Sequence, residues 1–203
     1  MNRQTSAQPE TCNLQPATRS PAILLDRDGT IVREVEYLAR PEQLALLPGA
    51  AEGLRRLREE GYHLVIVTNQ AGVARGYFTE EDVRRVHERL RQMLRERDAD
   101  VDAVYYCPHH PQGQGAYRQE CPCRKPATGM HQRAARELNL DLARSVVIGD
   151  NVTDILPGTE LGCRTVLVRT GYGQSLLDAG ALDDVPVDHV AASLLQAADW
   201  ILQ

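Results

Sequence analysis

The chain has 203 residues, of which 42% are hydrophobic and 25% are charged, and its formal net charge at pH 7 is −5. This length suits one globular domain of ordinary size and is too short for two large ones. No apolar run is long enough to span a membrane, and the mixed charges lack the basic stripe with which a general nucleic-acid binder displaces counterions. The charge balance still permits an anionic small-molecule substrate that is held by a few local donors.

The first twenty residues are polar, contain two prolines and lack the apolar segment of a signal peptide. We therefore predict a disordered tail over 1–20, followed by a single domain over 21–203. Because the chain shows no export signal and no disulfide pattern, the expected compartment is the cytoplasm.

The predicted elements begin with a buried strand at 22–25, where four apolar residues follow one another. A helix is expected over 48–61, because a proline stands near its start, two leucines share one face and Gly61 ends it. A second buried strand is predicted at 63–67.

The most amphipathic segment predicts a helix over 79–97, capped by Thr79 and with acidic residues in its first turn. Its apolar stripe consists of Val83, Val86, Leu90 and Leu94. A third strand is expected at 101–106. About 18 residues rich in Pro, Gly, Gln and Cys follow, and their composition is too irregular to hold a conformation unaided.

The rest of the chain repeats the alternation of strands and helices. Helices are expected at 129–139, 153–161 and 191–201, and strands at 145–148 and 164–168. This order predicts an α/β fold with a Rossmann-like, doubly wound parallel sheet covered on both faces. Pro157 is compatible with its helix only if that helix begins late.

Polar side chains follow three of these strands. Asp26 and Asp28 follow the first strand, residues 68–70 (Thr-Asn-Gln) follow the second, and Asp150 follows the fourth, with Asp154 close behind. Ligands of such sheets bind beyond the carboxyl ends of the strands. Carboxylate oxygens suit Mg²⁺, and an aspartate can also act as a nucleophile. Each acid taken alone could simply cap the next helix, but capping does not require the pattern D-x-D-G-T.

Lys125 is the only lysine, beside 22 arginines. It lies between the third and fourth predicted strands, from where it can reach the edge that carries the carboxylates. A composition bias could leave one lysine by chance. Alternatively, this position needs a compact ammonium on a flexible stem, which a planar guanidinium does not imitate.

A second group of residues has the spacing of a metal site. It consists of Cys107, His109, Cys121 and Cys123, in the sequences C-P-H-H and C-P-C. Three thiolates and one imidazole form a closed tetrahedral set for structural Zn²⁺. Spacing favours His109 over His110 as the fourth ligand. The expected zinc loop spans 107–123 and directs the Arg-Lys pair that follows it; the alternative is a loop of unpaired cysteines. Cys12 and Cys163 are expected to be unliganded, with Cys163 in the core.

Four ordered segments, LLDRDGT, VTNQ, the single Lys-Pro and GDNVTD, resemble the motifs of haloacid dehalogenase-like phosphatases over residues 22–170. The resemblance implies that Asp26 is the nucleophile and that Asp28 is the general acid and then the general base. It implies that Mg²⁺ lies between the carboxylates of Asp26 and Asp150 and the carbonyl of Asp28. Thr68 and Lys125 would hold the phosphoryl oxygens.

Two further segments, GVARGYFTEED and YYCPHHPQG, together with the zinc loop, resemble heptose 1,7-bisphosphate 7-phosphatases. Histidinol phosphatases share the Cys/His loop but not the first segment, and polynucleotide 3′-phosphatases lack the loop. The implied reaction is Mg²⁺-dependent removal of the 7-phosphate through an aspartyl phosphate. The implied partner is a phosphorylated sugar, with no nucleic acid or membrane, and the expected state is a monomer.

The expected substrate-binding residues surround the phosphate site. They are Glu34, Tyr37, Thr68, Asn69, Gln70, Arg124 and Lys125. Arg124 would meet a second phosphate or a sugar hydroxyl, or could be only a surface charge. The connections after the first two strands are too short for a cap domain, so loops must provide selectivity. Asn151 stands where relatives often carry a basic residue, which leaves its part in metal binding open.

Histidinol phosphatase or a broad sugar phosphatase is an alternative function. A non-catalytic module that binds through the zinc loop is a more distant one.

Overall fold

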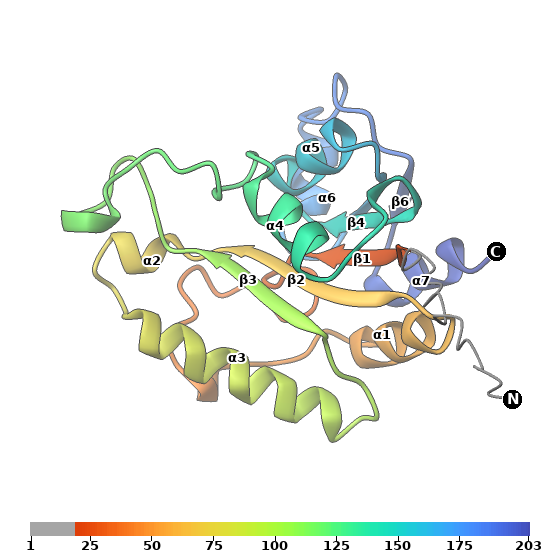
Figure 1. Ribbon diagram of the computed structural model, residues 1–203, viewed down its shortest axis with the longest axis horizontal. Coiled ribbons are helices and arrows are strands. Elements are labelled where there is room, and N and C mark those ends of the chain that lie inside the picture. Colours follow the sequence, from red (N-terminus) through yellow and green to blue (C-terminus); the bar gives the residue numbers. More distant parts are fainter. Residues whose placement is uncertain (1–18) are drawn as a thin grey trace, which may run out of the picture.

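A computed structural model describes residues 19–203 and contains a six-stranded parallel sheet with the strand order β3-β2-β1-β4-β5-β6 (Figure 1). The strands are β1 (Ala22–Leu25), β2 (His63–Asn69), β3 (Ala103–Cys107), β4 (Val146–Gly149), β5 (Arg164–Val168) and β6 (His189–Ala191). Of the expected tail at 1–20, residues 1–18 lie outside the described residues, and Cys12 is one of these.

Seven α-helices are described. They are α1 (Ala50–Glu59), α2 (Ala71–Ala74), α3 (Glu80–Arg95), α4 (Gly129–Glu137), α5 (Val152–Glu160), α6 (Gly173–Asp178) and α7 (Leu194–Ile201). Short 3-10 turns lie at Pro41–Gln43, Gly115–Tyr117 and Leu142–Arg144. Thr79 caps α3 as expected, since its hydroxyl accepts a hydrogen bond from the Asp82 amide at 3.2 Å.

The two faces of the sheet carry separate apolar cores, because successive side chains of a strand point to opposite faces. Ile23 and Leu25 of β1 belong to the core beneath α1, α3 and α7, whereas Ala22 and Leu24 belong to the core that α4 covers. Figure 1 shows α1 and α3 on one side of the sheet and α4 and α5 on the other. The predicted doubly wound α/β fold is therefore confirmed.

The structure corrects three details. The last helix begins at Leu194 rather than at 191, because residues 189–191 pair with β5 as an edge strand. The short helices α2 and α6 were not expected from the sequence, since four and six residues carry little periodicity.

The helix α5 begins within one residue of its expected start at 153, but the late start that we required for Pro157 to be compatible with it is not found. The helix starts at Val152 and contains Pro157. It starts there because Asn151 caps it: the Asn151 side chain accepts a hydrogen bond from the Thr153 amide at 3.2 Å, and Asp154 accepts one from the Asn151 amide at 3.0 Å. Capping is thus the observed role of Asn151.

Within the described residues, the connection after β1 contains one 3-10 turn and α1, and the connection after β2 contains α2 and α3. This is expected for a chain without a cap domain. The connection between β3 and α4, 108–128, contains one 3-10 turn at Gly115–Tyr117. None of the helices in the described part of the chain is both long and apolar enough to cross a membrane.

Candidate active site

The first motif directly follows β1, a central strand of the sheet. The Asp26 amide still donates to the Ile148 carbonyl of β4 at 2.9 Å, so the nucleophile candidate stands directly at the end of the hydrogen-bonded ladder. The chain then turns at Gly29, whose φ is +79°. A Cβ atom at Gly29 would lie 2.1 Å from an Asp150 carboxylate oxygen, so this turn requires glycine.

The second motif stands at the end of β2, the neighbour of β1. Thr68 is 1% exposed, and the Gln70 amide donates to the Thr68 hydroxyl and to the Asp28 carboxylate, at 3.1 Å in each case. Gln70 therefore links the threonine expected to bind phosphate with the aspartate expected to carry the proton.

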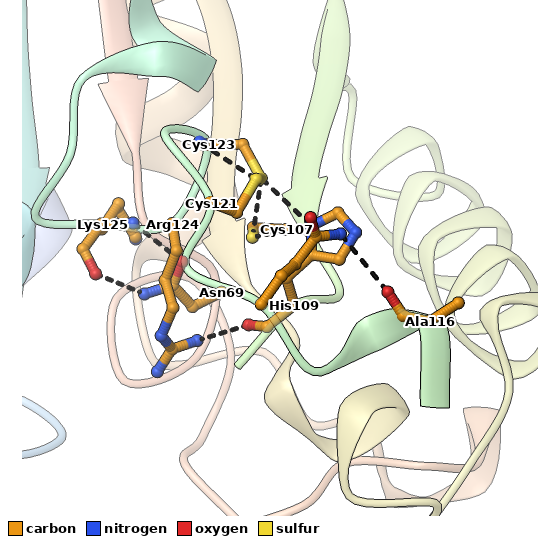
Figure 2. The surroundings of a disulfide bond; sticks show 9 residues. Asn69, Cys107, His109, Ala116, Cys121, Cys123, Arg124 and Lys125 are labelled. Atoms are coloured by element: carbon orange, nitrogen blue, oxygen red, sulfur yellow. Dashed lines mark hydrogen bonds between the residues drawn. A yellow bond between two sulfur atoms is a disulfide. The ribbon is translucent and has the colours of Figure 1, made fainter. Parts of the chain in front are cut away.

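Asn69 binds the backbone of the lysine motif. Its side-chain amide donates to the Lys125 carbonyl and accepts from the Lys125 amide, each at 3.1 Å (Figure 2). Both polar ends of this side chain are therefore in use within the protein. The geometry makes Asn69 a positioning residue for Lys125, and the direct substrate contact expected from the sequence stays a prediction.

Lys125 is 4% exposed and lies among oxygen atoms. Its ammonium is 2.6 Å from Asp26 Oδ1, 2.8 Å from Asp154 Oδ1 and 2.6 Å from the Val67 carbonyl. Burial alone would lower the pKa of Lys125, but the two carboxylates raise it above its ordinary value. Lys125 is therefore a permanent cation against the nucleophile candidate.

Three carboxylates crowd the same edge of the sheet. Ligand oxygens of Asp26, Asp150 and Asp154 lie within 4.8 Å of one another. Burial, with repulsion from the neighbouring carboxylates, raises the pKa of Asp26 to about 7 despite Lys125, and that of Asp150 to about 8. One ammonium does not neutralise three carboxylates, so the site is short of positive charge.

A divalent cation would supply that charge. Hard carboxylate oxygens at one open edge fit Mg²⁺, and Asp26 and Asp150 are the residues with oxygens free to hold it. Asp154 is committed elsewhere, since one oxygen meets Lys125 and the other accepts the Asn151 amide at 3.0 Å. Sequence reasoning did not assign Asp154 to the site, although the GDNVTD motif contains the signal.

A pocket opens at this edge, and its walls include every catalytic, substrate-binding and magnesium-binding residue expected from the sequence. These residues are Asp26, Asp28, Glu34, Tyr37, Thr68, Asn69, Gln70, Arg124, Lys125 and Asp150. Partial burial and the Asp28 charge raise the pKa of Glu34. Tyr37 meets the exposed ring of Tyr77 edge-on at 4.6 Å. The pocket wall is thus largely polar, and its Tyr37 ring packs against Tyr77.

Arg124 and Arg75 form a second cationic area beside the pocket. The Arg124 guanidinium donates to the His109 carbonyl at 3.3 Å. Burial and the nearby Arg75 charge lower the pKa of Arg124, and the same two arginines help to lower that of His110. Over residues 19–203 neither arginine has a carboxylate partner, and Arg75 Nε is buried without a hydrogen bond.

The four residues expected to bind zinc also come together. Ligand atoms of Cys107, His109, Cys121 and Cys123 lie within 4.8 Å of one another. The sulfurs of Cys123 and Cys107 are 2.8 Å apart, and the Cys123 sulfur is 3.5 Å from His109 Nδ1. His110 is outside the cluster, since its Nδ1 accepts the Gln112 amide.

The expectation of free thiols differs from the structure at one point. Cys121 and Cys123 are joined by a disulfide. Figure 2 shows this disulfide beside the sulfur of Cys107 and the ring of His109. A tetrahedral metal site requires both as thiolates, so metal binding and this disulfide exclude each other. Cys163 is buried in the core that α4 covers, as expected.

Backbone hydrogen bonds tie the end of the cysteine loop to the segments on either side of Lys125. The Arg124 amide donates to the Cys121 carbonyl and the Gly129 amide to the Pro122 carbonyl, both at 2.9 Å. The far end of the loop is held by Tyr117, whose hydroxyl donates to the Glu80 carboxylate of α3 at 2.7 Å. The two backbone bonds hold the chain on both sides of Arg124 and Lys125.

The comparisons with known proteins agree with this geometry. A family model described as haloacid dehalogenase-like hydrolase matches residues 23–93, and one described as HAD-hydrolase-like matches residues 122–197. The chain is 44% identical over 153 residues to the D-glycero-beta-D-manno-heptose-1,7-bisphosphate 7-phosphatase of Haemophilus influenzae, covering 74% of this chain and 82% of the relative. The protein of that name from Escherichia coli K12 is 40% identical over 184 residues, 90% of this chain and 88% of the relative. The chain belongs to the haloacid dehalogenase-like hydrolases.

A solved structure extends the agreement to the fold. The D,D-heptose 1,7-bisphosphate phosphatase of B. bronchiseptica, complexed with magnesium and phosphate, superposes with a TM-score of 0.81 at 33% identity, over 90% of this chain and 98% of that one. Family membership, expected from four motifs, is thus confirmed.

The crowded carboxylates of this haloacid dehalogenase-like site predict a pH-dependent stability. In the metal-free protein the folded pKa values of Asp26 and Asp150 are above the ordinary value of 3.8. Folded molecules therefore keep protons that unfolded ones release, and stability should fall as pH rises from about 4 to 8.

Magnesium competes with those protons, so the gain in Tm on adding Mg²⁺ should grow over the same range. Thermal unfolding of the chelated and Mg²⁺-loaded protein at several pH values measures both. A gain in Tm that is constant with pH would contradict the prediction.

Proposed function

We propose that the protein is a Mg²⁺-dependent phosphomonoesterase that removes the 7-phosphate of D-glycero-D-manno-heptose 1,7-bisphosphate and leaves heptose 1-phosphate. The observation that carries this proposal is the convergence of Asp26, Lys125 and Asp150 on one pocket edge. The substrate is inferred from the relatives, whose names state this reaction.

In the proposed reaction an Asp26 carboxylate oxygen attacks phosphorus, and the bond between phosphorus and the sugar oxygen breaks. Asp28 gives a proton to the departing oxygen and later takes one from the water that cleaves the aspartyl phosphate. Thr68 and Lys125 hold the phosphoryl oxygens. Magnesium, held by the Asp26 and Asp150 carboxylates and the Asp28 carbonyl, would neutralise charge on the transferred group.

A bisphosphate substrate suits the second cationic area. Arg124 lines the pocket and Arg75 lies beside it, and neither has a carboxylate partner over residues 19–203. Two guanidinium groups that are not paired with carboxylates provide several hydrogen-bond donors for one phosphate. We therefore propose that Arg124 binds the phosphate that is not cleaved, and that Arg75 adds positive charge next to Arg124.

The test is phosphate release with Mg²⁺ from heptose 1,7-bisphosphate, histidinol phosphate and a set of sugar monophosphates. We expect kcat/KM to favour the heptose bisphosphate by about a hundredfold, which is about 2.7 kcal/mol of transition-state free energy. Arg124→Ala should lose most of that preference. A preference for histidinol phosphate would move the protein to the alternative function, and a flat profile would contradict the substrate.

We also propose Zn²⁺ as the ion of the cysteine loop, because three thiolates and one imidazole match its preferred donors. Cys123→Ser should lower the zinc content well below one ion per chain and make the loop over 107–123 sensitive to protease. It should reduce kcat/KM about tenfold to a hundredfold, since Lys125 follows two residues later.

Cys163→Ala is the matched control, because Cys163 is buried outside the cluster and should leave the zinc content unchanged. Elemental analysis of reduced protein measures the outcome. Full zinc content in the Cys123→Ser protein would contradict the assignment.

The remaining features belong to the same proposal. The protein should act as a monomer in the cytoplasm on a small phosphorylated sugar, without nucleic acid or membrane. Its net charge of −5 disfavours polyanionic partners and is compatible with one anion held by local donors.

A further inference from the structure

The residue between the two motif aspartates carries a buried charge. Arg27 is 1% exposed and is among the largest fully buried side chains of the described residues. A buried guanidinium is strongly unfavourable unless its donors are paired. Its Nε lies 3.1 Å from both carboxylate oxygens of Asp28, and its Nη2 is 2.7 Å from Oδ2. Arg27 thus binds the side chain of its own neighbour.

The other end of Arg27 meets a histidine from a distant element. Its Nη1 is 2.9 Å from His87 Nε2, on the buried face of α3. An arginine has no acceptor, so His87 must accept, and its ring is neutral with the proton on Nδ1. His87 is 7% exposed, and its ring lies against Tyr106 of β3 at 5.8 Å between centroids.

This arrangement fixes the direction of the Asp28 carboxylate. Arg27 holds it from one side, and Gln70, the residue after β2, donates to the same Oδ2 at 3.1 Å. We propose that Arg27 and His87 form a positioning pair that orients Asp28 for proton transfer, with His87 preventing the guanidinium from turning away. This inference rests on the proposed function, in which Asp28 protonates the leaving oxygen.

Leaving-group dependence separates this role from a structural one. A sugar alkoxide leaves only when it is protonated, whereas nitrophenolate leaves with little help from an acid. His87→Leu should therefore lower kcat/KM for the sugar phosphate by about tenfold or more and that for p-nitrophenyl phosphate by less than about threefold. Inhibition by inorganic phosphate should stay unchanged.

Two conservative variants complete the test and keep it decisive if the leucine variant does not fold. The amide oxygen of His87→Gln can reach Arg27 and should restore the sugar phosphate rate, whereas His87→Asn is one methylene shorter and should not. Val83→Ala, on the buried face of the same helix, is a control that should lower Tm without changing the ratio of the two rates.

Equal losses on both substrates, or equal rates for the Gln and Asn variants, would overturn the inference. Failure of the proposed function looks different. In that case the unmodified protein would release no phosphate from any substrate, or Asp26→Asn would release as much as the unmodified protein.

Discussion

Asp26→Asn should abolish turnover while leaving the fold intact. The amide cannot attack phosphorus, and loss of a nucleophile that acts together with its partners costs about 10⁴-fold or more in kcat. Binding of phosphate should survive, because Thr68 and Lys125 are unchanged. Phosphate release measures turnover, and the gain in Tm on adding inorganic phosphate measures binding.

The same variant has a second expected effect, on stability. Asp26 is a buried carboxylate whose pKa is raised to about 7 by burial and by its acidic neighbours. Removing its charge relieves that repulsion, so the chelated variant should be at least as stable as the chelated parent at pH 8. Its gain in Tm on adding Mg²⁺ should shrink, because a ligand is lost.

Asp184→Asn is the matched control for both measurements, since Asp184 is exposed and far along the chain from the site. It should change neither turnover nor the gain in Tm. Turnover by Asp26→Asn at the parent rate would exclude an aspartyl-phosphate mechanism that uses this residue.

Lys125→Met should have the second large effect, on activity and stability together. It removes the ammonium that lies 2.6 Å from Asp26 and 2.8 Å from Asp154. Removing one partner of a buried ion pair costs about 3–5 kcal/mol of unfolding free energy. Activity should fall about a thousandfold, since a donor to the phosphoryl oxygens is lost and Asp26 is protonated more readily.

The stability loss should grow with pH. Without Lys125 the folded pKa of Asp26 moves further above its unfolded value, so the folded state loses more free energy as pH rises from about 4 to 8. Thermal unfolding at several pH values and kcat/KM measure the two effects.

Lys125→Arg should not restore activity, because oxygens of Asp26, Val67 and Asp154 surround the ammonium at 2.6 to 2.8 Å and leave no room for a planar guanidinium. Arg133→Ala, which removes an exposed cation on α4, is the control and should change neither quantity. Full activity of the Arg variant would mean that only charge matters at this position.

The core elements and the chemical identity of the site were predictable from the sequence. Strands such as 63–67 are continuous apolar runs, and the helix over 79–97 combines a cap with a regular apolar stripe, so local signals were enough. The motif residues stand directly after strands. Because parallel strands end at one edge, position in the chain already placed Asp26, Thr68 and Asp150 together.

Some features depended on contacts between distant segments. The strand at His189–Ala191 is three residues long and exists because β5 offers a partner, not because of its own pattern. The helix α5 is closed at its start by a reciprocal cap between Asn151 and Asp154, and it contains Pro157. Short segments carry too little periodicity to specify their own conformation.

The sequence by itself was enough to identify the family and to predict a nucleophile candidate, the lone lysine and the four residues of the cysteine loop, since each is a residue type at a fixed spacing. Only the tertiary structure decided that Asp154 neutralises Lys125 and that His87 supports Arg27 across 60 positions of the chain. Such roles depend on which buried groups satisfy one another's charge and hydrogen bonds. Burial and distance exist only once the chain has folded.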